Sequence, residues 1–419
     1  AFRCWRQALL LRQEYDLPFE RFALTRAAHV AYQGQREAAD LTQLDALMND
    51  ADKIRMQSLI TRERILGPAH PDTTYYIRYR GAVYADFGVF SRCIDLWLYA
   101  LNIQQSIMEP LCSLTLGSFM SFAELFCFLL NDSTRNQQQN FSFNNNNDNQ
   151  NQAPNLEPRS LRFSDVYLIL NMAVDEIGRW LNMEICKDFS MEGVASKGPF
   201  SFPNRTSILN AIDNCRHVER DKNGDHKLLL VIIHLLALAQ RCLTHEQAVG
   251  VKFGKENVEA QKNEEKFKLR KTVYELLRVD PRDGQRSSLL HLACKEDSTA
   301  LGNYPLCRFP SLPVIELLLD SGADWYTLDQ EGRSPLHLCL ANRIHRRSVA
   351  VCLLNKGASL FVADKTGRSP YDMLKSSGSD LPIVKYVTLK ELAAVAVRKH
   401  QLPYRNRLPP HLFELLERL

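Results

Sequence analysis

The chain has 419 residues, of which 45% are hydrophobic and 24% are charged, and its formal net charge is +4. These values are those of ordinary globular protein, and the length allows roughly two to four domains. The net charge is too small to indicate a nucleic-acid-binding protein.

The eleven cysteines are scattered and include no Cys-x-x-Cys pair, so they match neither a zinc-site nor a disulfide pattern. Free thiols indicate a reducing compartment, and a cytoplasmic location, extending to the nucleus, is expected. The longest apolar run, Leu228–Ala239, is too short to span a bilayer, and no signal peptide is found, so no membrane association is expected. The chain begins at Ala1 within a predicted helix, and its natural N-terminus is expected to lie upstream.

Residues 1–130 are predicted to form helix pairs of the tetratricopeptide type. In the clearest pair, Thr74–Gln105, Gly81 on the first helix and Trp97 on the second match the small and aromatic residues that let antiparallel helices nest. The pattern recurs 92 residues earlier, where Trp5 aligns with Trp97, so the chain opens on the second helix of a repeat. A further helix pair is predicted after Pro110. Trp97 is interpreted as a core aromatic residue rather than part of a binding pocket.

Residues 131–158 are rich in Asn and Gln and cannot bury enough apolar area to offset the entropy of ordering, so a disordered insertion is predicted. Residues 159–280 are predicted to be helical, with a loop at Gly193–Asn204. Helices are expected at residues 161–181, 206–215, 227–243 and 255–277. His234, in an apolar helix, is interpreted as a core histidine because no carboxylate or thiol lies at a metal-ligand spacing beside it.

Residues 281–387 carry three versions of the ankyrin Thr-Pro-Leu-His turn, which begin at Ser288, Ser334 and Ser369. The last two are 35 residues apart, close to the ankyrin period, and an excess of about a dozen residues in the first interval falls at Thr299–Pro313. Ankyrin repeats are therefore predicted. A shortened third repeat is expected, whose second helix begins near Leu381.

His291 and His337 belong to these turns. A catalytic role would need a nucleophile at a recognisable spacing, and neither histidine has one. Both are therefore interpreted as structural residues that connect neighbouring turns by hydrogen bonds. No catalytic residue, metal site or cofactor is predicted anywhere in the chain.

Two apolar patterns follow one another in residues 388–419. In the first, Leu389, Ala393 and Val397 recur every four residues and line one face of a helix. In the second, Leu408-Pro409 leads a helix in which prolines suit the first turn. Its apolar stripe has the spacing i, i+3, i+4, i+7 and consists of Leu412, Leu415, Leu416 and Leu419.

The order of the two patterns resembles a VHL box, the docking tail of a cullin–RING ubiquitin ligase receptor. The resemblance implies elongin-binding residues Leu389, Ala393 and Val397, with Ala393 standing where Cys is the commonest residue. It implies cullin-binding residues Leu408, Pro409, Leu412 and Leu415. The alternative is that the two helices only cap the repeats before them.

Tetratricopeptide-like helices, ankyrin repeats and a VHL box in this order resemble the Fem (feminization) family of elongin–cullin-2 ligase receptors. The stretches Arg78–Asp86 and Ser121–Phe126 are similar to that family as well. The resemblance implies an all-α helical repeat solenoid and a non-catalytic receptor whose partners are elongin B/C, cullin-2 and substrates with C-terminal degrons. In the family an N-terminal ankyrin array binds those degrons, so no substrate-binding residue is assigned here, and homodimerisation is left open.

The competing interpretation is an ankyrin and tetratricopeptide scaffold that binds a partner without any ligase. An enzyme is a distant third, because the sequence contains no Gly-rich phosphate loop, nucleophile elbow or metal-ligand pattern.

Overall fold

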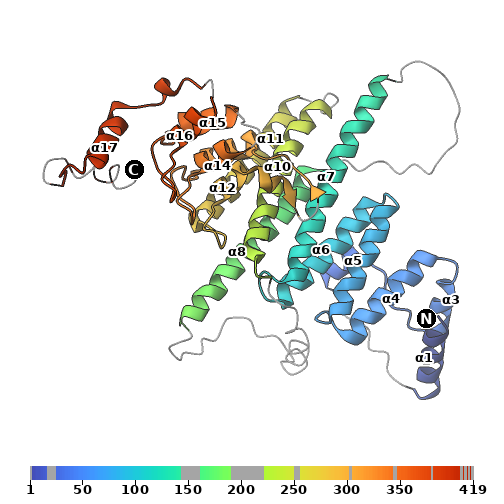
Figure 1. Cartoon of the computed structure of the whole chain (residues 1–419). Coiled ribbons are helices and arrows are strands. Elements are labelled where there is room, and N and C mark those ends of the chain that lie inside the picture. The colour runs from blue at the N-terminus through green and yellow to red at the C-terminus, as the bar shows by residue number, and fades with distance from the viewer. Residues whose placement is uncertain are drawn as a thin grey trace. The chain divides into compact units, whose positions relative to one another are not determined.

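The computed structural model describes residues 2–16, 25–142, 161–189, 221–249, 255–301, 304–342, 347–378 and 381–405, together with Pro409, Phe413 and Leu416. The described residues are helical apart from loops and two strands of two residues each, which confirms the all-α prediction (Figure 1). The chain divides into two compact units: residues 1–118, 144–159 and 182–221, and residues 119–143, 160–181 and 222–419.

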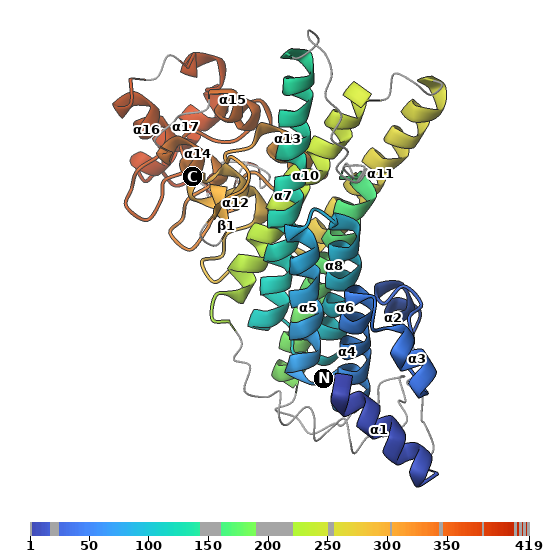
Figure 2. The ribbon, with the colours of Figure 1, turned by 90° about the vertical axis from the view of Figure 1, so that its right-hand side faces the viewer.

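The first unit contains short helices followed by long ones. They are α1 (Phe2–Glu14), α2 (Arg26–Ala31), α3 (Leu41–Ala46), α4 (Ala51–Leu66), α5 (Pro71–Asp86), α6 (Phe90–Ile107) and the start of α7 (Ser113–Ser142). Helices α4, α5 and α6 lie side by side in both views, as tetratricopeptide-like helices do (Figures 1 and 2).

Helices α5 and α6 form the predicted nested pair. Gly81 on α5 is where the two come closest, because a Cβ atom added there would lie 2.4 Å from Cδ1 of Trp97 on α6. The indole Nε1 of Trp97 donates a 2.9 Å hydrogen bond to the carbonyl oxygen of Arg78. Gly88, at φ +73°, turns the chain between the helices. Trp97 therefore packs between the two helices, but it is half-buried and not fully in the core as predicted.

Helix α7 corrects two predictions. It is one helix of 30 residues in place of the predicted helix pair after Pro110, and it continues to Ser142, twelve residues into the segment 131–158 that was expected to be disordered. Gln and Arg are good helix formers, and adding residues to a helix that is already nucleated costs little. The rest of that segment, the Gly193–Asn204 loop and the 206–215 helix lie outside the described residues.

The second unit is built around α10 (Gly224–Val249), an apolar helix onto which α12 (Leu289–Cys294) and α13 (Leu312–Asp320) pack. Helix α8 (Phe163–Phe189) and α11 (Lys255–Val279) complete the helical region before the ankyrin repeats. By length and composition, segments of α7 and α10 could cross a membrane, but 61% and 72% of those segments are buried inside the protein. Such burial is typical of core helices, and the shorter run Leu228–Ala239 is only the middle of α10.

The three ankyrin repeats begin at α12, α14 (Pro335–Ala341) and α16 (Pro370–Ser376), and the first two have second helices, α13 and α15 (Arg347–Asn355). The insertion in the first interval contains a 3₁₀ turn (Glu296–Thr299) and the two-stranded antiparallel hairpin β1 (Ala300–Leu301) and β2 (Tyr304–Pro305). Helix α17 (Leu389–Lys399) follows the repeats.

The third repeat departs from the prediction of a second helix near Leu381. Only a 3₁₀ turn, η3 (Ile383–Lys385), forms there. Pro382 lacks an N–H donor, and proline disfavours helical geometry in the residue before it. Val384 is 89% exposed and Ile383 is half-buried, so little apolar burial favours a longer helix here.

Candidate functional site

Helix α17 begins where its sequence specifies a start. Thr388 is the N-cap: its Oγ1 accepts a 3.2 Å hydrogen bond from the main-chain N–H of Glu391, and the Glu391 carboxylate accepts hydrogen bonds from the N–H and the hydroxyl of Thr388. This reciprocal capping box satisfies N–H groups that a helix start leaves unpaired. The positively charged Arg398 and Lys399 lie in the last turn, where they interact favourably with the negative end of the helix dipole.

Two of the three predicted elongin-binding residues are exposed on α17. Leu389 is 86% exposed and Ala393 is exposed, whereas Val397 is half-buried. Leu392, 45% exposed, and Ala396 widen the same face. The inward face contains Ala394, which is buried. The helix therefore presents two leucines beside two alanines, an apolar strip that another helix or a groove could cover.

The predicted cullin-binding residues are described only in part. Pro409 is exposed, whereas Leu408, Leu412 and Leu415 lie outside the described residues. Phe413 has helical backbone and places its ring edge-on to Tyr404, with centroids 5.7 Å apart.

Leu416 is also helical, and only 4% of its side chain is exposed. One member of the Leu412–Leu419 stripe is thus a packing residue. Leu416 was not among the residues predicted to bind a cullin, so its burial does not bear on that prediction.

His291 and His337 have the structural role predicted for them. Nδ1 of His291 accepts from the N–H and hydroxyl of Ser288, at 3.3 and 2.8 Å, so Nε2 carries the proton that it donates to the carbonyl oxygen of Arg333, 3.0 Å away. Burial lowers the pKa of His291 to about 4, against the opposing effect of the Arg333 carbonyl. A neutral imidazole that uses both nitrogens in this way cannot also serve as a general base.

Each ankyrin turn begins with an aspartate whose Oδ1 accepts two main-chain hydrogen bonds. For Asp283, Asp329 and Asp364 the donors are the N–H groups two and four residues further on, at 2.7–3.0 Å. Successive turns are joined by hydrogen bonds from Gln330 N–H to the Gln285 carbonyl and from Lys365 N–H to the Glu331 carbonyl. These aspartates therefore fix the conformation of the turns through main-chain hydrogen bonds.

A pair of thiols was not recognised in the sequence, because its members are 180 residues apart. Cys127 on α7 donates a 3.1 Å hydrogen bond to the carbonyl oxygen of Leu306 and contacts the thiol of Cys307. The hydrogen bond from Cys307 lowers the pKa of Cys127, against burial, and Arg241 adds to the lowering. Both thiols are buried.

Another polar cluster that the sequence did not reveal holds the first unit together. Glu63 is buried and accepts hydrogen bonds from the hydroxyls of Tyr32, at 2.6 Å, and Tyr99. Burial raises the pKa of Glu63, while the two hydrogen bonds oppose that rise. The two tyrosine rings meet edge to face. No metal-binding cluster of three or more His, Cys, Asp or Glu occurs in the described part of the chain.

The sequence is similar to those of several known proteins. The family described as ankyrin repeats (many copies) matches residues 305–354. Over its whole length the chain is 36% identical to protein fem-1 homolog A of Danio rerio and 35% identical to that of Homo sapiens. It is 33% identical to protein fem-1 homolog C of Xenopus laevis. The chain spans 52–57% of the length of these three relatives.

Proposed function

We propose that this chain, which belongs to the fem-1 homolog family, is a substrate-receptor subunit of an elongin–cullin-2 RING ubiquitin ligase. In this proposal α17 binds elongin C, the helix after it contacts cullin-2, and substrates carry C-terminal degrons. Ubiquitin transfer is performed by other subunits, and the chain supplies proximity, which is worth several kcal/mol of an activation barrier.

The observation that carries the proposal is the exposure of Leu389. A helix that only caps a repeat array buries its apolar side chains against that array. Leu389 and Leu392 instead project into solvent, whereas the small Ala394 is the buried member of α17. Burying one leucine side chain in a partner's pocket would stabilise the complex by about 1.5–3 kcal/mol.

Capture of purified elongin B/C by the full chain tests this role. Leu389→Ala removes the anchor and Ala393→Phe places a large ring on the strip, so each is expected to weaken binding by tenfold or more, since an anchor contributes about 2 kcal/mol. Val384→Ala is the matched control, because Val384 is equally exposed in the same unit but lies outside α17.

The scaffold function remains the second candidate, and the same experiment separates the two. If wild type, Leu389→Ala and Ala393→Phe capture equal amounts of elongin, or if none captures any, the ligase assignment is wrong. The ankyrin repeats would then be the part of the chain to search for partners.

A further inference from the structure

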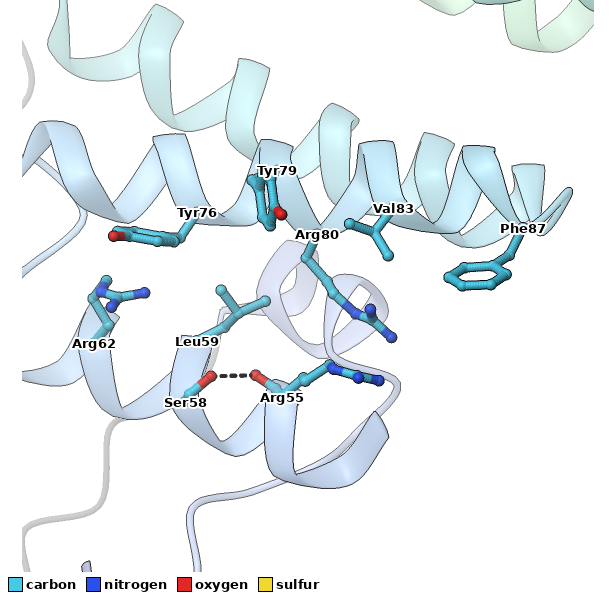
Figure 3. Close-up of a pocket in the computed structure, with 9 residues that line it drawn as sticks. All are labelled: Arg55, Ser58, Leu59, Arg62, Tyr76, Tyr79, Arg80, Val83 and Phe87. Atoms are coloured by element: carbon cyan, nitrogen blue, oxygen red, sulfur yellow. Dashed lines mark hydrogen bonds between the residues drawn. The ribbon is translucent and has the colours of Figure 1, made fainter. Parts of the chain in front are cut away.

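A groove in the first unit runs between α4 and α5 and has a volume of about 470 Å³. Figure 3 shows its two walls, with Arg55, Ser58, Leu59 and Arg62 on α4 facing a row of side chains on α5. It is distant in sequence from the C-terminal helices, and none of the functions assigned above uses it.

The α5 wall is aromatic. Tyr76, Tyr79 and Phe87 line the groove and are 37%, 58% and 75% exposed. Tyr75 stacks beside Tyr79, with ring centroids 6.5 Å apart. Large exposed rings clustered along one helix are a feature of binding surfaces, because they offer apolar area at low cost in side-chain entropy.

The groove is also positively charged. Three of its nine lining residues are arginines and none is acidic. Arg80 is committed to an ion pair with Asp52, but neither Arg55 nor Arg62 forms an ion pair among the described residues. The guanidinium of Arg62 lies 3.6 Å from the ring centroid of Tyr76. A guanidinium stacked in this way keeps the N–H groups at its edge for a carboxylate.

The size of the groove indicates its ligand. Phe87, the C-cap of α5, follows Tyr76 by eleven positions, or about 16 Å along the helix axis at 1.5 Å per residue. An extended peptide of about five residues covers this distance. The two arginines that form no ion pair in the described part of the chain lie with Leu59 on the α4 wall, and the aromatic rings lie on the α5 wall. The groove therefore matches carboxylates that alternate with apolar side chains.

We propose that the α4–α5 groove binds an extended acidic peptide segment of a partner protein, with carboxylates on Arg55 and Arg62 and apolar side chains on Tyr79 and Phe87. A phosphate-rich strand is the less favoured ligand, because two free arginines neutralise few phosphates and Leu59, Val83 and Phe87 make part of the lining apolar.

Fluorescence anisotropy with the full chain tests the proposal. The probe is a fluorescein-labelled decapeptide in which glutamates alternate with leucine and phenylalanine. Arg55→Glu/Arg62→Glu is expected to weaken its binding at least tenfold. The control Arg3→Glu/Arg36→Glu makes the same change in net charge at exposed arginines that do not line the groove, and should change affinity less than twofold. Tyr79→Ala is expected to weaken binding about fivefold.

Several outcomes would overturn the proposal. They are equal losses in the two double variants, tight binding of the peptide with glutamine in place of glutamate, a thymidine decanucleotide that binds better than the peptide, and no saturable binding. Thermal melting of each variant establishes that it is folded. Leu389→Ala should leave peptide binding unchanged, so the outcome is independent of the ligase proposal.

Discussion

Nε2 of His291 lies 3.0 Å from the main-chain carbonyl oxygen of Arg333, 42 residues further along the chain. The same contact recurs one repeat later, from His337 to the carbonyl oxygen of Arg368, at 3.3 Å. Each histidine thus caps its own helix through Nδ1 and holds the next turn through Nε2. Adjacent ankyrin repeats are joined by one side chain with two functions.

Removing this connection should destabilise the second unit. His291→Ala leaves the buried N–H of Ser288 without its partner, removes one of the two donors to the carbonyl oxygen of Arg333 and opens a cavity, so a loss of about 2–4 kcal/mol in the free energy of unfolding is expected. His400→Ala, at an exposed histidine of the same unit, should change it by less than about 0.5 kcal/mol. Urea unfolding measures both, and equal effects would contradict the structural role.

His234 should make stability depend on pH. Burial lowers its pKa to about 4 from an ordinary value near 6.5, while its Nε2 donates to the carbonyl oxygen of Ser298 at 2.9 Å. Because the folded-state pKa is the lower one, the unfolded chain binds the proton first. The stabilising contribution is therefore complete above pH 6.5 and is lost as the pH falls from about 6.5 to about 4.

The size of this effect can be read from a variant. Between pH 7 and pH 4.5, the free energy of unfolding of His234→Leu should fall by roughly 2–3 kcal/mol less than that of the wild type. The measurement is urea unfolding at several pH values, where the difference between the two curves, and not the absolute stability, is decisive. Parallel curves would mean that His234 is not neutral in the folded protein.

The approach of α5 to α6 predicts opposite effects for two glycines. Gly81→Ala forces Trp97 to move, because the new Cβ would lie 2.4 Å from the indole, and a loss of about 1–3 kcal/mol is expected. Gly117→Ala, in a helix of the same unit with no atom within 4 Å of the new Cβ, should stabilise by about 0.5–1 kcal/mol. Circular dichroism melts compare them, and a neutral Gly81→Ala would refute the close packing.

The cullin assignment has its own test. Pro409→Ala/Leu412→Ala should preserve elongin C binding and weaken capture of cullin-2, because the two predicted patches belong to separate helices and need not couple. Co-purification of both partners with the double variant is the measurement. Loss of both partners would indicate misfolding, and retention of both would mean that the second stripe does not bind a cullin.

The sequence predicted what depends on local pattern. Gly81 with Trp97, and Ser334 with His337, occur at spacings that fix the contact once the helices form, and the structure contains both contacts. The four-residue spacing of Leu389, Ala393 and Val397 likewise predicted a helix, and α17 (Leu389–Lys399) contains all three.

Features that depend on distant partners were missed. No local pattern in the sequence indicates that Tyr32 and Tyr99 bind Glu63, or that Cys127 contacts Cys307. Only tertiary packing brings these residues together. The end of α7 was predicted too early for another reason. Composition around Asn131 describes the cost of ordering an isolated segment, whereas a helix already formed upstream lowers that cost.

The third ankyrin turn has Asp372 where the first two have histidine. Its Oδ2 accepts from the N–H and hydroxyl of Ser369, at 3.0 and 2.6 Å, and so reproduces the cap. A carboxylate has no N–H to offer to the carbonyl oxygen of a following turn, so the third repeat lacks the side-chain link that His291 and His337 provide. The side-chain links therefore have a direction: each runs from a histidine to the turn that follows it, and the series stops at Asp372.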